Sequence, residues 1–263
     1  MVKKFMERHL PFLFSNKAYL AYGVENSPTR YPLDKARYVL IASYIADEQA
    51  RLKRPVRVLD IGCSEGMMIL YCNKLLTPTE FYGMDILQER LDKALRRGYK
   101  SVLLQDIRKR PLPYKDGFFD VVICSHILEH LLDPGELLGE LGRVMKDDAL
   151  IIVGVPIGLL PGILWRRHIT PLYSKRKSVE ESLKRFGHVT FFTLPDLKKL
   201  LGRRRFVVES ARGDYMIRAR KFFLENYRWW YRLNQIYGRI FPGLWGHVTV
   251  KARFKPSLSV DGS

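Results

Sequence analysis

The sequence predicts an α/β fold built on a doubly wound, mainly parallel sheet. Short apolar runs recur between residues 56 and 155, and stretches with helical spacing separate them. The runs are mostly apolar, without regular polar alternation, which is typical of strands that are covered on both faces. We therefore expect one sheet with helices on each side.

The elements follow one another in a regular order. Residues 33–53 predict a helix, because Pro32 suits its first turn and apolar residues recur at helical spacing. Helices are also expected near residues 66–76, 88–97 and 133–145, between the strands. The predicted strands are VRVLDI (56–61), EFYGMDI (80–86), SVLLQDI (101–107), FFDVVICS (118–125) and ALIIVGV (149–155).

The pattern changes after residue 155. Two short helices are expected at residues 178–187 and 193–202, each with a capping residue at its start and a glycine at its end. FVVES (206–210) and HVTVKARF (247–254) predict strands. The second of these alternates apolar and polar residues, so one of its faces is expected to meet water or substrate.

The charge of the chain is unevenly distributed over its 263 residues, a length that suits one α/β domain with insertions. Of the formal charge of +18, residues 1–150 hold 23 Lys/Arg and 20 Asp/Glu, a difference of +3. Residues 151–263 hold 22 and 7, a difference of +15. This excess predicts a surface that meets phosphate, nucleic acid or an acidic membrane, and the alternative is a solvated basic face.

The cysteines and the N-terminal residues indicate a compartment. Three cysteines without C-x-x-C spacing predict free thiols under reducing conditions and argue against a disulfide framework or a structural zinc site. Glu7, Arg8 and His9 interrupt the apolar run that a secretion signal would need. We expect a cytoplasmic protein, with the basic half as a reason to consider peripheral contact with the inner face of a membrane.

The segment GCSEG (62–66) fits two kinds of chemistry. As G-x-S-x-G it is the nucleophile elbow of a serine hydrolase, with Ser64 as the nucleophile. As a glycine-rich turn after a buried strand, it brings backbone close to a nucleotide-like cofactor. A hydrolase needs several strands before the elbow and an oxyanion motif upstream, and the preceding residues offer neither. The pattern therefore favours the cofactor interpretation.

Asp85 adds a second observation in favour of a nucleoside site. In such α/β domains the second strand ends in an acid that holds the ribose hydroxyls. Asp85 ends EFYGMD, 19 residues after Gly66, and a carboxylate can accept hydrogen bonds from two vicinal hydroxyls at once. The turn is not G-x-G-x-x-G, which disfavours a nicotinamide or flavin cofactor.

Four segments in order resemble the class I S-adenosylmethionine-dependent methyltransferases. They are VLDIGCSEG, YGMD, LLQDI and PYKDGFFDVVICSHILEHLLDP. Within that class the chain most resembles the small-molecule group (methyltransferase type 11) that includes the ubiquinone-biosynthesis enzymes. The likeness covers residues 35–155 and, less closely, 187–211. It implies a Rossmann-like sheet of seven strands, with S-adenosylmethionine as cofactor and S-adenosylhomocysteine as product.

The resemblance also implies a division of the chain. Residues 1–55 would form a helical cap on the acceptor side, and residues 56–155 the S-adenosylmethionine-binding core. Residues 156–263 would complete the same domain. Two basic and aromatic insertions, at 156–186 and 212–246, would lie in this last part.

The resemblance assigns cofactor contacts residue by residue. Asp85 would hold the ribose, with Ile86 against the adenine. Asp106 would accept from the adenine amino group and Ile107 would flank the ring, the alternatives being a loop cap for Asp106 and a plain core position for Ile86. The turn beneath the methionine part would consist of Asp60, Gly62, Cys63, Ser64 and Gly66, while Ser125 and His126 would face the sulfonium.

Catalytic residues are harder to assign. Methyl transfer from a sulfonium needs a general base only when the acceptor must first lose a proton. His126 and His188 are candidate bases by their positions in the resemblance, with a structural or cofactor-orienting role as the alternative. His126 and Glu129-His130 also form an H-x-x-E-H pattern, but its place directly after a parallel strand argues against a zinc site. We expect no metal, and expect Glu129 and His130 to hydrogen-bond locally.

The acceptor is expected to lie against the basic insertions. Residues 217–241 predict an amphipathic helix with Arg228, Arg232 and Arg239 in its polar stripe. Such a helix suits a membrane interface, packing onto the domain, or a partner chain. We expect a small or lipid-like acceptor, anionic or membrane-borne, with an anionic membrane surface as partner.

Two other functions stay open. An RNA methyltransferase could use Lys175–Lys177 and Arg203–Arg205 as phosphate clamps beside aromatic residues. A catalytically silent module could use the same cofactor site for interaction alone.

Overall fold

The structure is a computed structural model that describes residues 33–72, 79–108, 111–157, 189–213, 228–244 and 246–257. The predicted helix at 178–187, the candidate base His188 and nearly all of the insertion at 156–186 lie outside these residues. The same holds for residues 1–32 and 214–227.

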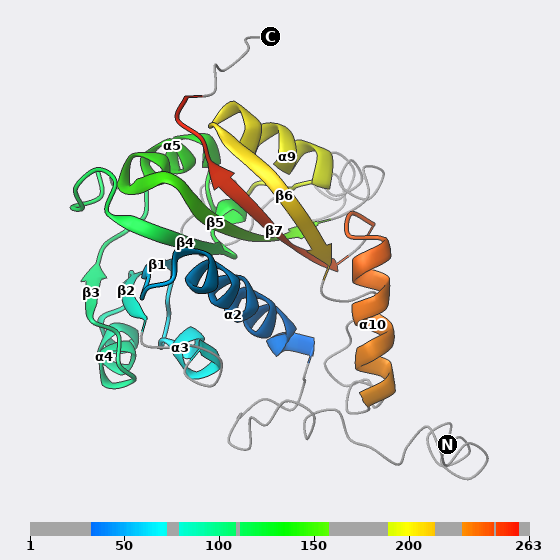
Figure 1. The fold of residues 1–263 in the computed structure, drawn as a ribbon, viewed down its shortest axis with the longest axis horizontal. Coiled ribbons are helices and arrows are strands. Elements are labelled where there is room, and N and C mark those ends of the chain that lie inside the picture. Colours follow the sequence, from blue (N-terminus) through cyan, green and yellow to red (C-terminus); the bar gives the residue numbers. More distant parts are fainter. Residues whose placement is uncertain are drawn as a thin grey trace, which may run out of the picture.

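Seven strands form one sheet in the order β3-β2-β1-β4-β5-β7-β6 (Figure 1). All neighbours from β3 to β5 are parallel, while β7 pairs antiparallel with both β5 and β6. The predicted doubly wound, mainly parallel, seven-stranded sheet is therefore confirmed. The strands are β1 (Arg57–Ile61), β2 (Glu80–Asp85), β3 (Ser101–Leu104), β4 (Phe119–Ser125), β5 (Met145–Ile157), β6 (Phe206–Gly213) and β7 (Gly246–Phe254).

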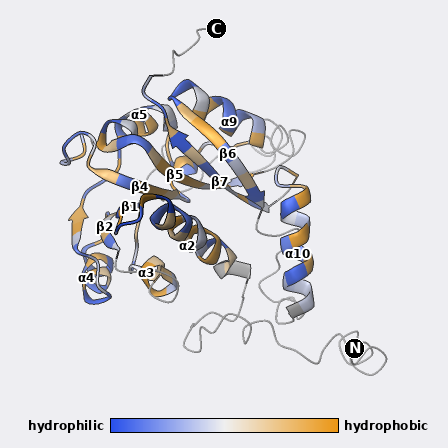
Figure 2. Ribbon diagram, in the orientation of Figure 1, coloured by the Kyte–Doolittle hydropathy of each residue, from blue (hydrophilic) through white to orange (hydrophobic). Residues whose placement is uncertain are grey.

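Helices cover both faces of the sheet. Since successive residues of a strand point to opposite faces, neighbouring residues belong to different cores. Val58 of β1 belongs to the core beneath α2 (Leu33–Leu52), α3 (Met67–Cys72) and α4 (Gln88–Arg96). Leu59, the next residue, belongs to the core beneath α5 (Pro134–Val144) and α9 (Leu194–Arg203). Figure 2 shows hydrophobic stretches on strands of the sheet, among them β3 and β4.

Three strands differ clearly in length from the prediction, and one of them, β6, extends to Gly213 instead of residue 210. β3 ends at Leu104 instead of residue 107, because its partner β2 ends at Asp85. The N–H of Gln105 donates to the carbonyl of Asp85, at the end of this pairing. β5 begins at Met145 and extends to Ile157, since β7 offers it an antiparallel partner along this length. Local sequence does not show how far a partner strand extends.

Most of the polar face of β7 is buried. Thr249 is fully buried, and Arg253 is 9% exposed and pairs with Glu48 of α2, whose carboxylate oxygen lies 2.8 Å from the guanidinium. The expectation of a face turned to water or substrate was wrong along this part of β7, because α2 packs across it. Burial alone would raise the pKa of Glu48, but the hydrogen bonds from Arg253 and Arg51 outweigh it and hold the pKa below its ordinary value.

The last helix, α10 (Arg228–Ile240), packs against β6. Gly238 of α10 lies directly on Gly213 of β6, and a Cβ at Gly238 would stand 1.9 Å from the carbonyl oxygen of Gly213. Only glycine permits this approach of helix backbone to strand backbone. The helix is thereby held at the end of β6, beside the carboxyl ends of the parallel strands (Figure 1).

Candidate functional site

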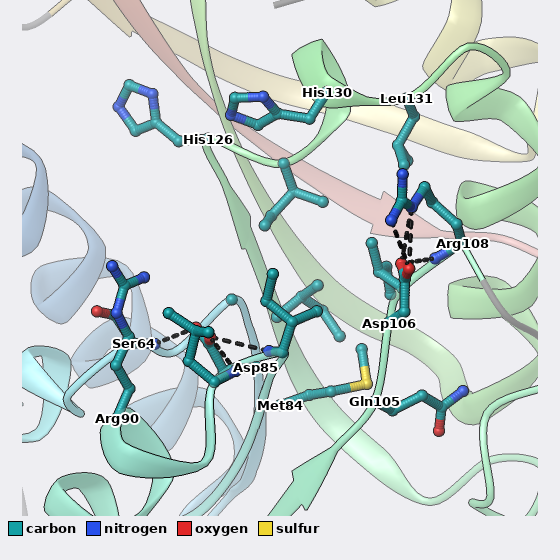
Figure 3. A pocket seen from close by; sticks show the side chains of 16 residues that line it. Ser64, Met84, Asp85, Arg90, Gln105, Asp106, Arg108, His126, His130 and Leu131 are labelled. Carbon is teal, nitrogen blue, oxygen red and sulfur yellow. Dashed lines mark hydrogen bonds and ion pairs between the residues drawn. The ribbon is translucent and has the colours of Figure 1, made fainter. Parts of the chain in front are cut away.

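The candidate site lies at the carboxyl ends of β1, β2 and β4. The strand order reverses between β1 and β4, and ligands of open α/β sheets bind at such a switch point. Figure 3 shows Ser64 next to Asp85 on one side, Asp106 across from them beside Arg108, and His126 and His130 above.

The glycine-rich segment forms the predicted strand–turn–helix unit between β1 and α3. Gly62, Ser64 and Gly66 all have positive φ angles, of 71°, 51° and 73°. The N–H groups of Gly62 and Cys63 donate to the carbonyl of Met84 at 2.7 and 3.0 Å, which ties the turn to β2. Glycine suits two of these positions sterically, and Ser64 holds the third at a cost in strain.

Asp85 is positioned by backbone N–H groups on both sides of the turn. One carboxylate oxygen accepts from the N–H of Ser64 at 2.9 Å, and the other from those of Ile86 and Leu87 at 2.9 and 3.1 Å. The side chain is 7% exposed and lines a cavity of about 350 Å³. A carboxylate held this rigidly presents its remaining lone pairs in a defined direction.

Four of the residues that the resemblance assigns to the adenosine part line this first cavity. Asp85, Ile86, Asp106 and Ile107 line it together, as the resemblance implied. Asp106 accepts hydrogen bonds from the backbone N–H of Arg108 at 2.9 Å and from its guanidinium at 2.6 Å (Figure 3). The carboxylate is thus oriented by its own loop at the cavity rim.

A second cavity of about 290 Å³ adjoins the first. Gly62, Ser64, His126 and Ile127 line both, so the two spaces meet at the turn. A Cβ on Gly62 would stand 2.5 Å from the end of the Ile127 side chain and would narrow this junction. The other predicted residues that line the second cavity are Asp60, Cys63 and Ser125.

Two of the predicted turn residues, Gly66 and Cys63, also pack against neighbouring elements. Gly66 lines neither of these two spaces and packs against Ala94 of α4 and Tyr99. The Cys63 side chain is 5% exposed and its sulfur lies against Gly83 of β2, and burial raises the pKa of this thiol. All three cysteines are free and buried.

Asp60 is a buried carboxyl beside the second cavity. Burial raises its pKa to about 7, the nearby charge of Asp85 adds to this, and the hydrogen bond from Tyr99 at 2.6 Å opposes it. Asp60 therefore carries a proton in a large fraction of molecules at neutral pH.

His126 is held between two charged side chains. Its Nδ1 lies 3.0 Å from a carboxylate oxygen of Glu129, and its Nε2 lies 2.8 Å from the guanidinium of Arg37. Because a guanidinium only donates, Nε2 accepts and Nδ1 carries the proton. Burial lowers the pKa of His126 to about 4, and its ring stacks on His247 at 4.5 Å. The imidazole is thus neutral at physiological pH.

Arg37 is a candidate site residue that the sequence did not single out. Its guanidinium lines the second cavity and bonds to His126 and to the hydroxyl of Tyr38 at 3.2 Å. It forms no ion pair with a carboxylate of the described segments. Arg37 lies on the same face of α2 as buried Ile41 and Tyr44, but no motif marks it. It comes to the site because α2 packs across the sheet.

The backbone of Glu129 also makes contacts, in addition to those of its carboxylate. It belongs to a short 3-10 turn, η3 (Leu128–His130), and its carbonyl accepts from the N–H groups of Val189 and Thr190 at 2.8 and 3.1 Å. The expected local hydrogen bonding of Glu129 is confirmed, and its carboxylate partner is His126. Among the described residues, no group of three or more His, Cys, Asp or Glu side chains has the arrangement of a metal site.

Comparisons with known proteins agree with this geometry. The family model described as "Methyltransferase domain" matches residues 33–211, more than half of the chain. A ubiquinone biosynthesis O-methyltransferase from Rhodopseudomonas palustris (strain BisA53) is 30% identical over 100 residues, which cover 37% of this chain and 39% of that protein. The human mitochondrial arginine-hydroxylase NDUFAF5 is 30% identical over 187 residues, 68% of this chain and 49% of that protein.

A solved structure shows the same fold. The Burkholderia thailandensis 1,6-didemethyltoxoflavin-N1-methyltransferase has a TM-score of 0.52 at 16% identity, covering 83% of this chain and 78% of that one. The matches to the first curated relatives span between 29% and 52% of the lengths of those proteins. The family match, the seven-stranded sheet and the glycine-rich turn followed by Asp85 all indicate the same family. The chain therefore belongs to the methyltransferase-domain family, the class I S-adenosylmethionine-dependent methyltransferases.

Proposed function

We propose that this protein transfers the methyl group of S-adenosylmethionine to a small or lipid-like acceptor. The pair of adjoining cavities carries the proposal: one is lined by Asp85 and Asp106, the other by Arg37 and Asp60, and the glycine turn lies between them. S-adenosylmethionine has the same two parts, a nucleoside and a zwitterionic amino acid, joined at the sulfur.

The first cavity would hold the nucleoside. We propose that Asp85 accepts hydrogen bonds from both ribose hydroxyls, because backbone N–H groups already orient its carboxylate. Asp106 would accept from the adenine amino group, with Ile86 and Ile107 against the ring. Displacing water from these apolar walls would add to the binding free energy.

The second cavity would hold the amino-acid part. Arg37 is a guanidinium without a carboxylate partner in the described segments, which suits the carboxylate of methionine. Asp60 would lie close to the positive groups of the cofactor. Bound S-adenosylmethionine would supply an activated methyl group on its sulfonium. The leaving group is the neutral thioether of S-adenosylhomocysteine.

The residues of this chain would act mainly by positioning. Methyl transfer is an in-line displacement, so its rate depends on alignment of the nucleophile and on exclusion of water. His126 is neutral, and its Nε2 is occupied by Arg37. We propose that the Glu129–His126 pair orients Arg37 at the junction of the cavities. General-base catalysis by His126 stays a prediction, and it would require an acceptor that displaces Arg37 from Nε2 of His126.

The acceptor class needs a direct test, because the human relative is named a hydroxylase. Purified protein incubated with labelled S-adenosylmethionine and either a lipid extract or an RNA extract should label the lipid fraction. Mass spectrometry of the product would show a gain of one CH2 unit for methyl transfer and of one oxygen atom for hydroxylation. Label in the RNA alone would favour the RNA methyltransferase, and binding without label in any extract would favour the silent module.

Replacing Arg37 by alanine should weaken binding of S-adenosylhomocysteine about tenfold or more, since a charge-assisted hydrogen bond to the carboxylate is lost. Isothermal titration calorimetry would measure this. Methylthioadenosine, which lacks the amino-acid part, is the matched ligand and should bind both forms equally. An equal loss for both ligands would contradict the placement of Arg37 at the carboxylate.

Binding of S-adenosylmethionine near pH 6 should release a proton from Asp60. The pKa of Asp60 is about 7 in the free protein, so its carboxyl is mostly protonated at pH 6. A bound cation favours the carboxylate and lowers that pKa, so the proton leaves. Titrations in buffers with different ionisation enthalpies count the released protons. Asp60→Asn should abolish the release, and an unchanged proton count in this variant would contradict the assignment.

A further inference from the structure

The helix α10 exposes an apolar face although it packs on the domain. Its packed side consists of Trp230, Tyr231 and Asn234, which are buried, and of Gly238 against β6. The side turned away from the sheet carries large apolar residues. Their exposed fractions are 43% for Leu233, 54% for Ile236, 62% for Ile240, 50% for Phe241 and 40% for Leu244.

These five residues follow one another along the helix and the turn after it at intervals of three, four, one and three, so they form one stripe, which we call the α10 face. Figure 2 shows the hydrophobic and hydrophilic residues intermixed along this helix. A solvated helix would carry polar residues here, and a contiguous apolar patch on a folded domain indicates an interaction site.

The charge beside the α10 face has one sign. Arg232 and Arg239 are exposed, and residues 228–244 contain no Asp or Glu. Neither arginine forms an ion pair with a carboxylate in the parts of the chain that the structure describes. Apolar residues flanked by unpaired arginines are typical of helices that lie in the interface of an anionic bilayer.

The position of α10 relates this face to the candidate site. β6 runs parallel to β5, because both pair antiparallel with β7. Gly213 of β6 and Val155 of β5 both lie opposite Val248 of β7, so the two strands end at about the same level of the sheet. The carboxyl end of β6, where α10 packs, is therefore at the same sheet edge as the two cavities. No helix of the described segments is long and apolar enough to cross a bilayer, so contact through these segments would be from one side.

We propose that the α10 face docks this protein onto an anionic phospholipid surface. The apolar side chains would enter the headgroup–acyl boundary, and Arg232 and Arg239 would contact lipid phosphates. A second copy of the chain fits this face less well, because it would bring like charges together. Docking itself does not depend on methyl transfer, although the delivery of a lipid-like acceptor to the site rests on the proposed function.

Co-sedimentation of the full chain with vesicles tests the proposal. Wild-type protein should sediment with phosphatidylcholine vesicles that contain phosphatidylglycerol, and far less with phosphatidylcholine alone. Ile236→Ser combined with Ile240→Ser should lower the partition coefficient at least tenfold. Arg232→Ala and Arg239→Ala should each lower it about fivefold, with the effect shrinking at high salt.

Matched controls separate this face from the overall basic charge. Leu95→Ser on α4 removes an apolar side chain that is 44% exposed, and Lys198→Ala with Lys199→Ala removes two exposed charges on α9. These variants should partition as wild type does. Titration with S-adenosylhomocysteine should give wild-type affinity for every variant, so that a failure of docking is distinguished from a failure of the cofactor site.

Three results would overturn the proposal. One is wild-type partitioning of the Ile236→Ser, Ile240→Ser variant, and another is an equal loss in the α9 control. The third is a wild-type dimer in solution, measured by sedimentation velocity, that the α10 substitutions dissociate, because the face would then be an interface between copies.

Discussion

Replacing Asp85 by alanine should weaken S-adenosylmethionine binding about a hundredfold or more. The expected loss is two hydrogen bonds from ribose hydroxyls to a charged acceptor, each of which contributes about 1.5–3 kcal/mol. The substitution also removes the acceptor of the N–H groups of Ser64, Ile86 and Leu87, which loosens the turn under the cofactor. Calorimetric titration with S-adenosylmethionine and S-adenosylhomocysteine measures both consequences.

Two further variants make this result interpretable. Asp85→Asn keeps one acceptor oxygen and the size of the side chain, so it should bind with intermediate affinity. Asp92→Ala removes a partly exposed carboxylate from α4 that lines neither cavity, and it should leave affinity unchanged. Thermal unfolding of each variant checks the fold. Wild-type affinity in a folded Asp85→Ala protein would contradict the nucleoside assignment and, with it, the proposed function.

Replacing Glu48 by glutamine should lower the free energy of unfolding by about 3 kcal/mol, because it leaves the buried guanidinium of Arg253 without its main counter-ion. Glu209 and the carbonyl of Asp148 still contact Arg253, which keeps the loss from being larger. Urea denaturation at pH 7 measures it. Arg51→Ala is the control: Arg51 is 43% exposed, so its pair with Glu48 should contribute less than about 1 kcal/mol.

The contribution of Glu48 should depend on pH. Its folded pKa is below the ordinary value, so the stabilisation is complete above that ordinary value and disappears as pH falls through the folded pKa. The difference between wild type and Glu48→Gln should therefore shrink in acid. Replacing Glu48 and Arg253 together by methionine should restore most of the stability. A difference that stays constant down to pH 3, or a double variant as unstable as Glu48→Gln, would contradict this account.

Local patterns predicted the glycine turn and the acid at the end of β2 because both depend on short-range properties. A buried strand followed by glycines at positions 62 and 66 needs only φ preferences and apolar runs to be recognised. The distance along the chain from Gly66 to Asp85 follows from one helix and one strand. The bounds of β3 and β5 were less predictable, since partner strands decide where pairing ends.

The C-terminal helix shows the limit of periodicity. The spacing of apolar residues between 228 and 240 indicates an amphipathic helix, but it does not show which apolar residues are covered. The contact of Gly238 with Gly213 turns Trp230 and Tyr231 toward the domain and leaves Ile236 and Ile240 exposed. That orientation depends on β6, and the sequence of β6 does not indicate that Gly213 contacts α10.

The sequence by itself determined the strand–turn–helix unit, the acid that ends β2 and the basic character of the C-terminal half, since each can be recognised from neighbouring residues. Only the tertiary structure decided that Arg37 reaches His126, 89 residues further along the chain, and that Arg253 is buried against Glu48. The physical reason is that α2 packs across the sheet through its apolar face. The partners of its charged residues follow from where that face comes to lie.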